Sequence, residues 1–313
     1  MLLFAKRQKL RLSKINPGAV DYGRPGIFLK SKGEKTLIFK SDIISSRANP
    51  AVKWVCGLQL KKIRDKEKSF FIEGEKLTYE ALKTGLPLTR VYVCKSKSDK
   101  IIPILKEFED DARYSSCQIF ILEDSVFEKV STENSPQGVI SVLKYIDFFN
   151  KYDIIYKDDI VKIKNARALI LHSIQDPGNL GAVIRSAVAF GVKNIFLSSD
   201  CVDVYNSKTV RGAMGTLFKV NISTVQNMDS LIKSLQENGR RVYAAELRDG
   251  AVSLTDIPLN CDDVFIIGNE GHGIPTDISS LCNGSVYIPI SQDAESLNAS
   301  VAASVIMWEQ SKK

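Results

Sequence analysis

The chain has 313 residues, of which 44% are hydrophobic and 25% are charged, an ordinary composition for a globular protein of about two domains. This composition excludes a disordered chain and a fibrous repeat. Its longest apolar runs, such as 168–171 and 264–267, are far shorter than the roughly 20 residues of a membrane-spanning helix. We therefore expect a soluble protein that is cytoplasmic, or organellar (mitochondrial or plastid) if its basic start is a presequence.

Cysteine spacing limits the kinds of site that the chain can hold. The six cysteines are scattered singly, with no CxxC pair and only two histidines to join them. This spacing favours reduced, mostly buried thiols over a disulfide framework. It also argues against a structural zinc, so we expect no metal.

Positive charge is concentrated in the first hundred residues. Residues 1–100 hold 23 Lys and Arg against 9 Asp and Glu, a balance of +14, which leaves −7 for residues 101–313 and a net +7. Lysines and arginines that neutralise phosphates gain affinity by releasing counterions, so this asymmetry favours a polyanionic partner. A solvated basic face is the alternative that charge alone leaves open.

Residues 1–45 are expected to form a basic extension. Five Lys and Arg precede residue 15, and the turn-rich stretches 16–18 and 23–26 follow them. A nucleic-acid-binding arm is favoured over an organellar presequence, because serines are few and no signal-peptide apolar core is present.

Residues 46–145 predict a compact α/β domain. A helical pattern begins at Asn49-Pro50 and runs through Leu60, where basic residues crowd its end. Strands are expected at 70–74, 90–94, 118–122 and 139–143, and helices at 77–84 and 101–107. Candidate contacts to the polyanionic partner in this region are Arg47, Lys61, Lys62 and Arg64. The charged, irregular stretch 146–165 is expected to be a linker.

From residue 166 onward, strands and helices alternate regularly. Strands are expected at 168–172, 194–197, 241–245, 264–268 and 286–288, and helices at 181–190, near 209–217 and at 296–309. Buried apolar strands joined by helices imply a parallel sheet covered on both faces. Such sheets bind ligands at the carboxyl ends of their strands.

The first candidate loop, Gln175–Gly181, follows a strand and opens the helix that carries Arg185. Pro177 and Gly178 favour a tight turn, and Asn179 is the expected N-cap. The free N–H groups and dipole of a helix start suit an anionic group, which Arg185 would also face. A generic strand–turn–helix with a surface arginine is the alternative.

Two further loops follow strands. Gly268–Pro275 has three glycines in six positions. Glycine loses more conformational entropy on folding than other residues, so three are expected only where the backbone takes left-handed angles or a ligand approaches closely. His272 in this loop is assigned no role. The third loop, Ile288–Ser300, leads into an alanine-rich helix, with Ser296 as the expected N-cap and Ser296, Leu297 and Asn298 as the functional candidates. Tight helix packing is the alternative reason for its small residues.

Taken together, the order and type of these loops resemble the SpoU (TrmH) family of SPOUT-class RNA 2′-O-ribose methyltransferases. Asn179 with Arg185 resembles the first motif of the family, and Gly268–Gly271 resembles the second. Ile288-Pro289 followed by Ser296–Asn298 resembles the third. The resemblance covers about half of the chain. It implies an α/β domain of parallel strands with a deep trefoil knot, a feature otherwise nearly absent from proteins. It also implies S-adenosylmethionine as cofactor and a homodimer.

The N-terminal domain has a looser resemblance. The strand 70–74 and the basic helix before it are similar to the substrate-binding domain found ahead of many SpoU domains, itself similar to kink-turn-binding ribosomal proteins. This implies a smaller α/β/α domain that binds RNA. A separate domain suits a structured stem or loop, so ribosomal RNA, of the large subunit, is favoured over transfer RNA.

The resemblance also implies roles for individual residues. Arg185 would act on the ribose hydroxyl; because a guanidinium stays protonated below a pH of roughly 12, phosphate clamping and alkoxide stabilisation are preferred to a base role. Arg211 would add a second phosphate contact, with a structural salt bridge as the alternative. The other implied catalytic residues are Asn179, Glu270, Ser296 and Asn298. The implied cofactor contacts are Ala245, Gly268, Asn269, Glu270, Ile288 and Leu297.

Two other functions are compatible with a basic α/β chain. One is a non-catalytic RNA-binding scaffold with a knotted dimerisation domain, which the presence of Arg185, Glu270 and Asn298 disfavours. The other is a nucleotide-dependent enzyme of doubly wound type. That class is expected to carry a GxGxxG or GxxxxGK[ST] turn after its first strand, and the sequence has neither.

Overall fold

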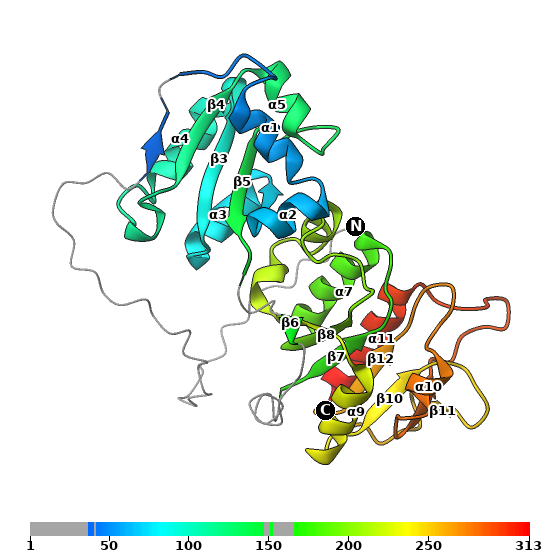
Figure 1. Ribbon diagram of the computed structural model, residues 1–313. Helices are drawn as coiled ribbons and strands as arrows, with labels where there is room; N and C mark the ends of the chain where they lie inside the picture. The colour runs from blue at the N-terminus through cyan, green and yellow to red at the C-terminus, as the bar shows by residue number, and fades with distance from the viewer. Residues whose placement is uncertain (1–36, 41, 147–150, 153–165) are drawn as a thin grey trace, which may run out of the picture. The chain divides into compact units, whose positions relative to one another are not determined.

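The computed structural model describes residues 37–40, 42–146, 151–152 and 166–313. Most of the expected basic extension at 1–45 and most of the expected linker at 146–165 lie outside these residues. The described residues from Leu37 onward belong to one compact unit that contains two sheets (Figure 1).

The N-terminal sheet has five strands in the order β1-β4-β3-β5-β2. β1 and β3 run parallel to β4, whereas β5 is antiparallel to both β2 and β3, so the sheet is mixed. The strands are β1 (Ile38–Phe39), β2 (Ser69–Glu73), β3 (Leu88–Cys94), β4 (Gln118–Leu122) and β5 (Val139–Lys144).

Helices cover both faces of this sheet. Val55 of α1 packs with Phe127 of α5 on one face, and Leu82 of α3 lies with Leu105 of α4 in the core of the other face. This three-layer arrangement agrees with the expected α/β/α domain. The helices are α1 (Pro50–Gly57), α2 (Lys61–Glu67), α3 (Glu75–Thr84), α4 (Ser98–Lys106) and α5 (Asp124–Val130).

The helix expected from Asn49 through Leu60 is in fact the first of two short helices. Asn49 caps α1, since its Oδ1 accepts a hydrogen bond from the Ala51 N–H at 2.8 Å. Pro50 occupies the first turn of α1, where its missing N–H removes no intrahelical bond. Lys68, with φ 48°, ends α2 in the left-handed region. The basic residues after Leu60 therefore belong to α2.

The second sheet has eight strands in the order β11-β13-β10-β12-β7-β8-β9-β6, and every neighbouring pair is parallel. Because all strands run in one direction, their carboxyl ends share one edge. The strands are β6 (Lys151–Tyr152), β7 (Ala168–Leu171), β8 (Asn194–Ser198), β9 (Asn221–Val225), β10 (Val242–Ala245), β11 (Val252–Ser253), β12 (Val264–Ile267) and β13 (Gly284–Tyr287).

Both faces of this parallel sheet are buried, as the apolar strands predict. Along β7, Leu169 and Leu171 join the core shared with α7 and α11, whereas Ala168 and Ile170 join the core shared with α9. β6, β9, β11, α9 and α10 lie outside the predicted elements, and β6, which pairs with β9, falls within the stretch expected to be a linker. The helices are α7 (Pro177–Ala189), α8 (Ser207–Gly212), α9 (Met228–Glu237), α10 (Thr276–Ser279) and α11 (Ala299–Ser311).

Two further features can be compared with expectation. All six cysteines are among the described residues, and none of them is in a disulfide. Within the described part of the chain, every helix falls short of the length and apolarity that a bilayer span requires.

α7 and α8 pack against each other through glycine. A Cβ atom on Gly181 would lie 2.7 Å from the carbonyl oxygen of Thr209 and 2.9 Å from the Cα of Gly212. Distances below 3.0 Å are essentially never seen for a real Cβ. Glycine at 181 therefore lets α7, which carries Arg185, lie directly on the backbone of α8.

We expect Gly181→Ala to lower the free energy of unfolding by about 1–3 kcal/mol, because the opposing atoms are backbone and cannot rotate away. Gly57→Ala in α1 is the matched control. Its Cβ would meet only the Ile63 side chain at 3.5 Å, so we expect it to be neutral or stabilising by up to about 1 kcal/mol. Urea unfolding of both variants measures the difference; equal stabilities would contradict the close contact.

Candidate active site

The three loops singled out in the sequence leave the sheet at neighbouring strands. The first follows β7, the second follows β12, and the third follows β13. β12 lies next to β7, and only β10 separates it from β13. The loops therefore converge at the carboxyl edge, as the parallel sheet predicts.

A chain of side-chain hydrogen bonds joins these loops. Asn298 Nδ2 donates to Asn179 Oδ1 at 3.0 Å, and Asn179 Nδ2 donates to Glu270 Oε1 at 2.9 Å. The backbone N–H of Gln175 reaches Glu270 Oε2 at 3.4 Å. Asn179 is thus bonded at both ends of its amide, and it brings together one candidate residue from each motif.

Glu270 is held as a carboxylate. Burial acts to raise its pKa, but the hydrogen bonds from Asn179 and from backbone N–H groups outweigh burial and lower the pKa below the ordinary value for glutamate. The group is therefore ionised at neutral pH, where it can only accept hydrogen bonds. This fixes the donor and acceptor of each hydrogen bond in the series, since the Asn179 amide must turn its NH2 toward Glu270.

α7 begins earlier than the sequence predicts, and the predicted N-cap at Asn179 is wrong. Asp176 is the cap: its Oδ1 accepts from the Asn179 N–H at 2.7 Å, and Pro177 occupies the first turn. Aspartate directly before proline is a strong helix start, because its carboxylate accepts a backbone bond while the proline needs none. The Asn179 side chain is consequently available to the other loops.

α11 begins later than the sequence predicts, and the predicted N-cap at Ser296 is also wrong. Asn298 caps this helix, with Oδ1 accepting from the Ser300 N–H at 2.9 Å and from the Ser300 hydroxyl at 2.7 Å. Ser296 lies in the exposed stretch before the helix. Asn298 thus uses its oxygen for its own helix and its NH2 for Asn179.

The glycine-rich second loop is closed on itself. Asn269 and Gly273 exchange backbone hydrogen bonds of 3.0 Å, and a Cβ on Gly268 would lie 2.5 Å from the Gly273 backbone. The turn itself therefore requires a glycine at 268. Asn269 Oδ1 accepts from the backbone N–H of His272 at 3.0 Å, and its Nδ2 donates to the Ser173 carbonyl at 2.7 Å. The loop is thereby fixed to the end of β7.

Arg185 lies on α7, and its side chain is exposed. Among the residues that the structure describes, none forms an ion pair or hydrogen bond with its guanidinium. An exposed guanidinium without a carboxylate partner is available to an anionic ligand.

The remaining cofactor candidates lie along the same edge. Ala245 ends β10, Ile288 follows β13, and Leu297 precedes α11; all three are partly exposed. Two exposed apolar side chains that the sequence did not single out flank them. Leu247, just after β10, is 81% exposed, and Ile290, after β13, is 39% exposed. Only the folded chain shows this exposure, because the sequence around both residues is ordinary for a loop.

Four of the five predicted RNA contacts are at least partly exposed. Lys62 is exposed, and Lys61 is exposed although it pairs with Asp65 at 2.6 Å. The Arg47 guanidinium donates to the Ser125 carbonyl at 2.9 and 3.2 Å. Arg211, which is 43% exposed, forms a salt bridge with Glu133 of the N-terminal domain, the structural alternative weighed from the sequence.

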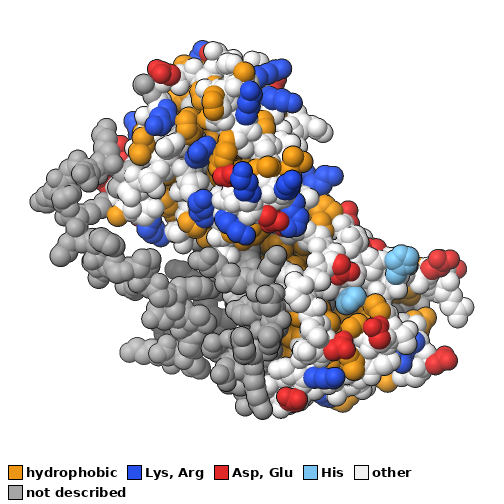
Figure 2. Space-filling view, viewed as in Figure 1, with side chains coloured by type: hydrophobic (Ala, Val, Ile, Leu, Met, Phe, Trp, Pro, Cys, Tyr) orange, Lys and Arg blue, Asp and Glu red, His pale blue; other side chains and the backbone are white. Residues whose placement is uncertain are grey.

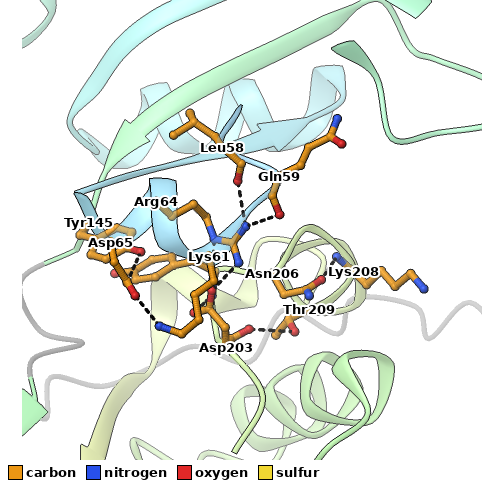
Figure 3. A network of polar contacts seen from close by, with 11 residues as sticks. Leu58, Gln59, Lys61, Arg64, Asp65, Tyr145, Asp203, Asn206, Lys208 and Thr209 are labelled. Carbon is orange, nitrogen blue, oxygen red and sulfur yellow. Dashed lines mark hydrogen bonds and ion pairs between the residues drawn. The ribbon is translucent and has the colours of Figure 1, made fainter. Parts of the chain in front are cut away.

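The structure gives Arg64 a different place (Figure 3). Its side chain is 4% exposed, and its guanidinium donates to the carbonyls of Leu58 and Gln59 at 2.8 Å and twice to Asp203 Oδ2, at 3.1 and 2.6 Å. A buried guanidinium with four such bonds is not presented to RNA, so we remove Arg64 from the candidate contacts. Loss of either charged partner would cost roughly 3–5 kcal/mol, because the other charge would stay buried.

The surface agrees with the charge asymmetry of the sequence. Figure 2 shows lysine and arginine side chains spread over one face of the N-terminal domain. On the C-terminal domain, the same view shows aspartate and glutamate interspersed with some lysine and arginine, and both histidines. On this face, the N-terminal domain therefore offers the more basic surface to a polyanion.

Family models match both parts of the chain. Residues 166–308 match the SpoU rRNA Methylase family, and residues 49–141 match an MRM3-like substrate binding domain. The chain is 32% identical over 266 residues to the 23S rRNA (guanosine(2553)-2′-O)-methyltransferase RlmP of Bacillus subtilis, which covers 85% of this chain and 97% of that protein. It is 28% identical over 272 residues to the uncharacterized tRNA/rRNA methyltransferase slr1673 of Synechocystis, covering 86% of this chain and 94% of that protein.

Solved structures show the same architecture. The AdoMet-bound rRNA methyltransferase from Sinorhizobium meliloti matches with a TM-score of 0.73 at 25% identity, over 88% of this chain and 98% of that one. The SpoU methyltransferase AviRb from Streptomyces viridochromogenes, at 21% identity over 84% of this chain and 98% of that one, shares the fold with a TM-score of 0.69. The predicted resemblance and the predicted α/β fold are thus confirmed, and the chain belongs to the SpoU rRNA methylase family.

Proposed function

We propose that this protein transfers a methyl group from S-adenosylmethionine to a ribose 2′-hydroxyl of ribosomal RNA, with the large-subunit RNA as its substrate. The observation that carries this proposal is the hydrogen-bond chain from Asn298 through Asn179 to Glu270. Asn179 lies on α7, which also carries Arg185, and within the described part of the chain no residue pairs with the Arg185 guanidinium. The relative from Bacillus subtilis is named as a 2′-O-methyltransferase of 23S rRNA, which supports the choice of substrate.

The carboxyl edge fits S-adenosylmethionine. The exposed side chains of Leu247 and Ile290 provide apolar surface for a purine. At Gly271 a Cβ would meet only Asn269 Oδ1, at 3.7 Å, so the loop leaves room there. The Sinorhizobium structure is described as AdoMet-bound. We assign the contacts to Ala245, Gly268, Asn269, Glu270, Ile288 and Leu297.

Methyl transfer requires the attacking oxygen, the methyl carbon and the sulfur to lie in line. When bound, the cofactor supplies an electrophilic methyl group on a positively charged sulfur. The protein's contribution is to hold the acceptor ribose in that line, and positioning of this kind can account for much of a rate enhancement. The hydrogen bonds of Asn179 to Glu270 and to Asn298 fix these three side chains relative to one another, as such positioning requires.

Arg185 is assigned to the RNA side of the reaction. Its guanidinium stays protonated at neutral pH and has five N–H donors, which suits a phosphate clamp and a developing alkoxide rather than a base. Ser296, in the exposed stretch before α11, is assigned to orienting the nucleotide.

We expect Arg185→Ala to lower kcat about 10²–10³-fold while S-adenosylmethionine affinity stays within about twofold, because the cofactor contacts lie on other loops. Methylation of ribosomal RNA and calorimetric titration of the cofactor measure the two quantities. Arg113→Ala, an exposed arginine of the N-terminal domain with 47% side-chain exposure, is the control and should match the parent. Equal methylation by Arg185→Ala and parent would remove Arg185 from the mechanism.

Cofactor binding by the parent also tests the alternative function of a non-catalytic RNA-binding scaffold, because a scaffold need not bind S-adenosylmethionine.

The lysines of α2 are proposed to hold the RNA. Lys61, Lys62 and Lys66 are exposed on one short helix, and the N-terminal domain has the basic surface in Figure 2. Arg47 and Arg211 are further contacts, provided that RNA replaces the Ser125 carbonyl and Glu133 as their partners. Phosphate contacts of this kind are electrostatic and independent of base sequence.

Replacing Lys61, Lys62 and Lys66 by alanine should weaken RNA binding and reduce the slope of log K against log salt by about 2–3, since each lost phosphate contact contributes roughly 0.7–0.9. The matched control replaces three exposed lysines of α3 and α4, Lys83, Lys100 and Lys106. Each set contains one lysine that is ion-paired, to Asp65 and to Glu75 respectively. An unchanged slope in the α2 variant would refute this assignment.

Other features of the family are proposed for this chain as well. A homodimer is supported by two exposed apolar residues on α11, Val301 and Trp308, which are 46% and 54% exposed. A trefoil knot in the C-terminal segment and a cytoplasmic location remain predictions. The expected division into a substrate-binding domain at 46–145 and a catalytic domain at 166–313 is supported by the two matched ranges.

A further inference from the structure

The connection between β8 and α8, residues 199–206, contacts the N-terminal domain through a buried ion pair. Arg64 of α2 donates twice to Asp203 Oδ2, at 2.6 and 3.1 Å (Figure 3). The two side chains are 4% and 13% exposed, so water screens the pair little. Because Nη1 of Arg64 is bonded to the carbonyls of Leu58 and Gln59, the guanidinium has a single orientation.

Asp203 is equally constrained on its own side. Its Oδ1 accepts from the Tyr205 N–H at 3.1 Å, and its carbonyl accepts from the Asn206 N–H at 3.0 Å and from the Thr209 hydroxyl at 3.3 Å. Asn206 is the N-cap of α8, and Thr209 lies on that helix. Asp203 therefore joins the N-terminal domain to the first turn of α8.

Aromatic rings complete the same contact. The Tyr205 ring stacks on Tyr145 at 4.1 Å with an interplanar angle of 13°, and lies 4.4 Å from the ring of Phe70. The Tyr205 hydroxyl accepts from the Ile146 N–H at 2.8 Å, and the Tyr145 hydroxyl donates to Asp65 at 2.9 Å. The contacts of Tyr205 stabilise the association of the domains, while the Tyr145–Asp65 bond lies within the N-terminal domain and holds the Tyr145 ring. The ion pair adds direction to the association.

α8, which begins beside this interdomain contact, also packs against α7, the helix of the candidate active site. Gly181 of α7 lies against the backbone of Thr209 and Gly212, with no room for a Cβ atom. α7 carries both Asn179 and Arg185. One continuous stretch of chain, from residue 203 to residue 212, thus touches the proposed RNA-binding domain and the proposed catalytic helix.

We infer that Arg64 and Asp203 are positioning residues that determine which ribose of the bound RNA reaches Arg185. The inference rests on the proposed function. RNA held by the N-terminal domain must present one hydroxyl to a site on the other domain, and a displacement of about 1 Å can cost about 10²-fold in rate. A guanidinium with four bonds in fixed directions sets that orientation more narrowly than ring packing does.

A second ion pair between the same domains provides the matched control. Arg211 and Glu133 also join the C-terminal and N-terminal domains, but their side chains are 43% and 29% exposed. An exposed pair is screened and contributes little. Glu133→Gln should therefore leave the domain orientation unchanged, although it removes an interdomain charge just as Asp203→Asn does.

The experiment uses the full chain with ribosomal RNA, and measures kcat and KM, the affinity for S-adenosylmethionine, and the position of every methylated ribose. We expect Asp203→Asn to lower kcat/KM about tenfold to a hundredfold, with most of the loss in kcat, and to spread methylation to riboses near the parent's target. The cofactor affinity should stay within about twofold. Glu133→Gln should methylate the same single ribose as the parent.

A second variant separates positioning from stability. Replacing Arg64 by Met and Asp203 by Leu removes both charges together, a change that is often neutral or stabilising for a buried pair. Because apolar contact lacks the fixed directions of the ion pair, this folded double variant should still spread the methylation sites. If Asp203→Asn is poorly folded, the double variant still tests whether the ion pair determines the methylated ribose.

The outcomes are distinguishable. A folded variant that methylates only the parent's ribose with unchanged kcat/KM would overturn the inference, and so would a loss of kcat that merely tracks the folded fraction while the target stays single. A parent that binds cofactor but methylates no RNA would instead refute the proposed function, and the inference with it.

Discussion

The side-chain amide of Asn179 is bonded at both ends, and the arrangement of the three loops depends on it. Its oxygen accepts from Asn298, and its NH2 donates to the Glu270 carboxylate. Since an ionised carboxylate only accepts, the amide has one allowed orientation, which leaves its oxygen for Asn298. Asn269 fixes the second loop to Ser173 in the same manner. Side-chain hydrogen bonds thus fix the three loops to one another at this edge.

Three arginines of this chain illustrate how surroundings decide the role of a residue type. Arg64 is buried and makes four hydrogen bonds, two of them to Asp203, so it joins the domains. Arg211 is half exposed and paired across the same interface, a contact that RNA can replace. Arg185 is exposed and has no carboxylate partner within the described residues, so it can meet a phosphate. The guanidinium chemistry is identical in all three, and only burial and partners differ.

Local signals predicted much of the catalytic domain but misplaced its helix starts. The apolar runs at β7, β8 and β12 identified the parallel sheet, because such runs are buried on both faces. The predicted starts of α7 and α11 each differ from the observed starts by several residues, because two residues that could cap each helix lie within a few positions of each other. Asp176 and Asn298 are the observed caps, and their capping bonds are local. What no local pattern contains is the pair of side-chain bonds that Asn179 makes to Asn298 and Glu270.

The sequence by itself determined the family, the order of the three motifs and the unequal charge of the two halves, because each is a property of residue type and spacing. It could not determine which basic residues face solvent. Arg64 and Asp203 are separated by 139 positions, and the local sequence around either residue does not predict its pairing with the other. Burial and pairing depend on what the fold brings together, so only the tertiary structure assigned Arg64 to the domain contact, left Arg185 unpaired among the described residues, and exposed Leu247 at the carboxyl edge.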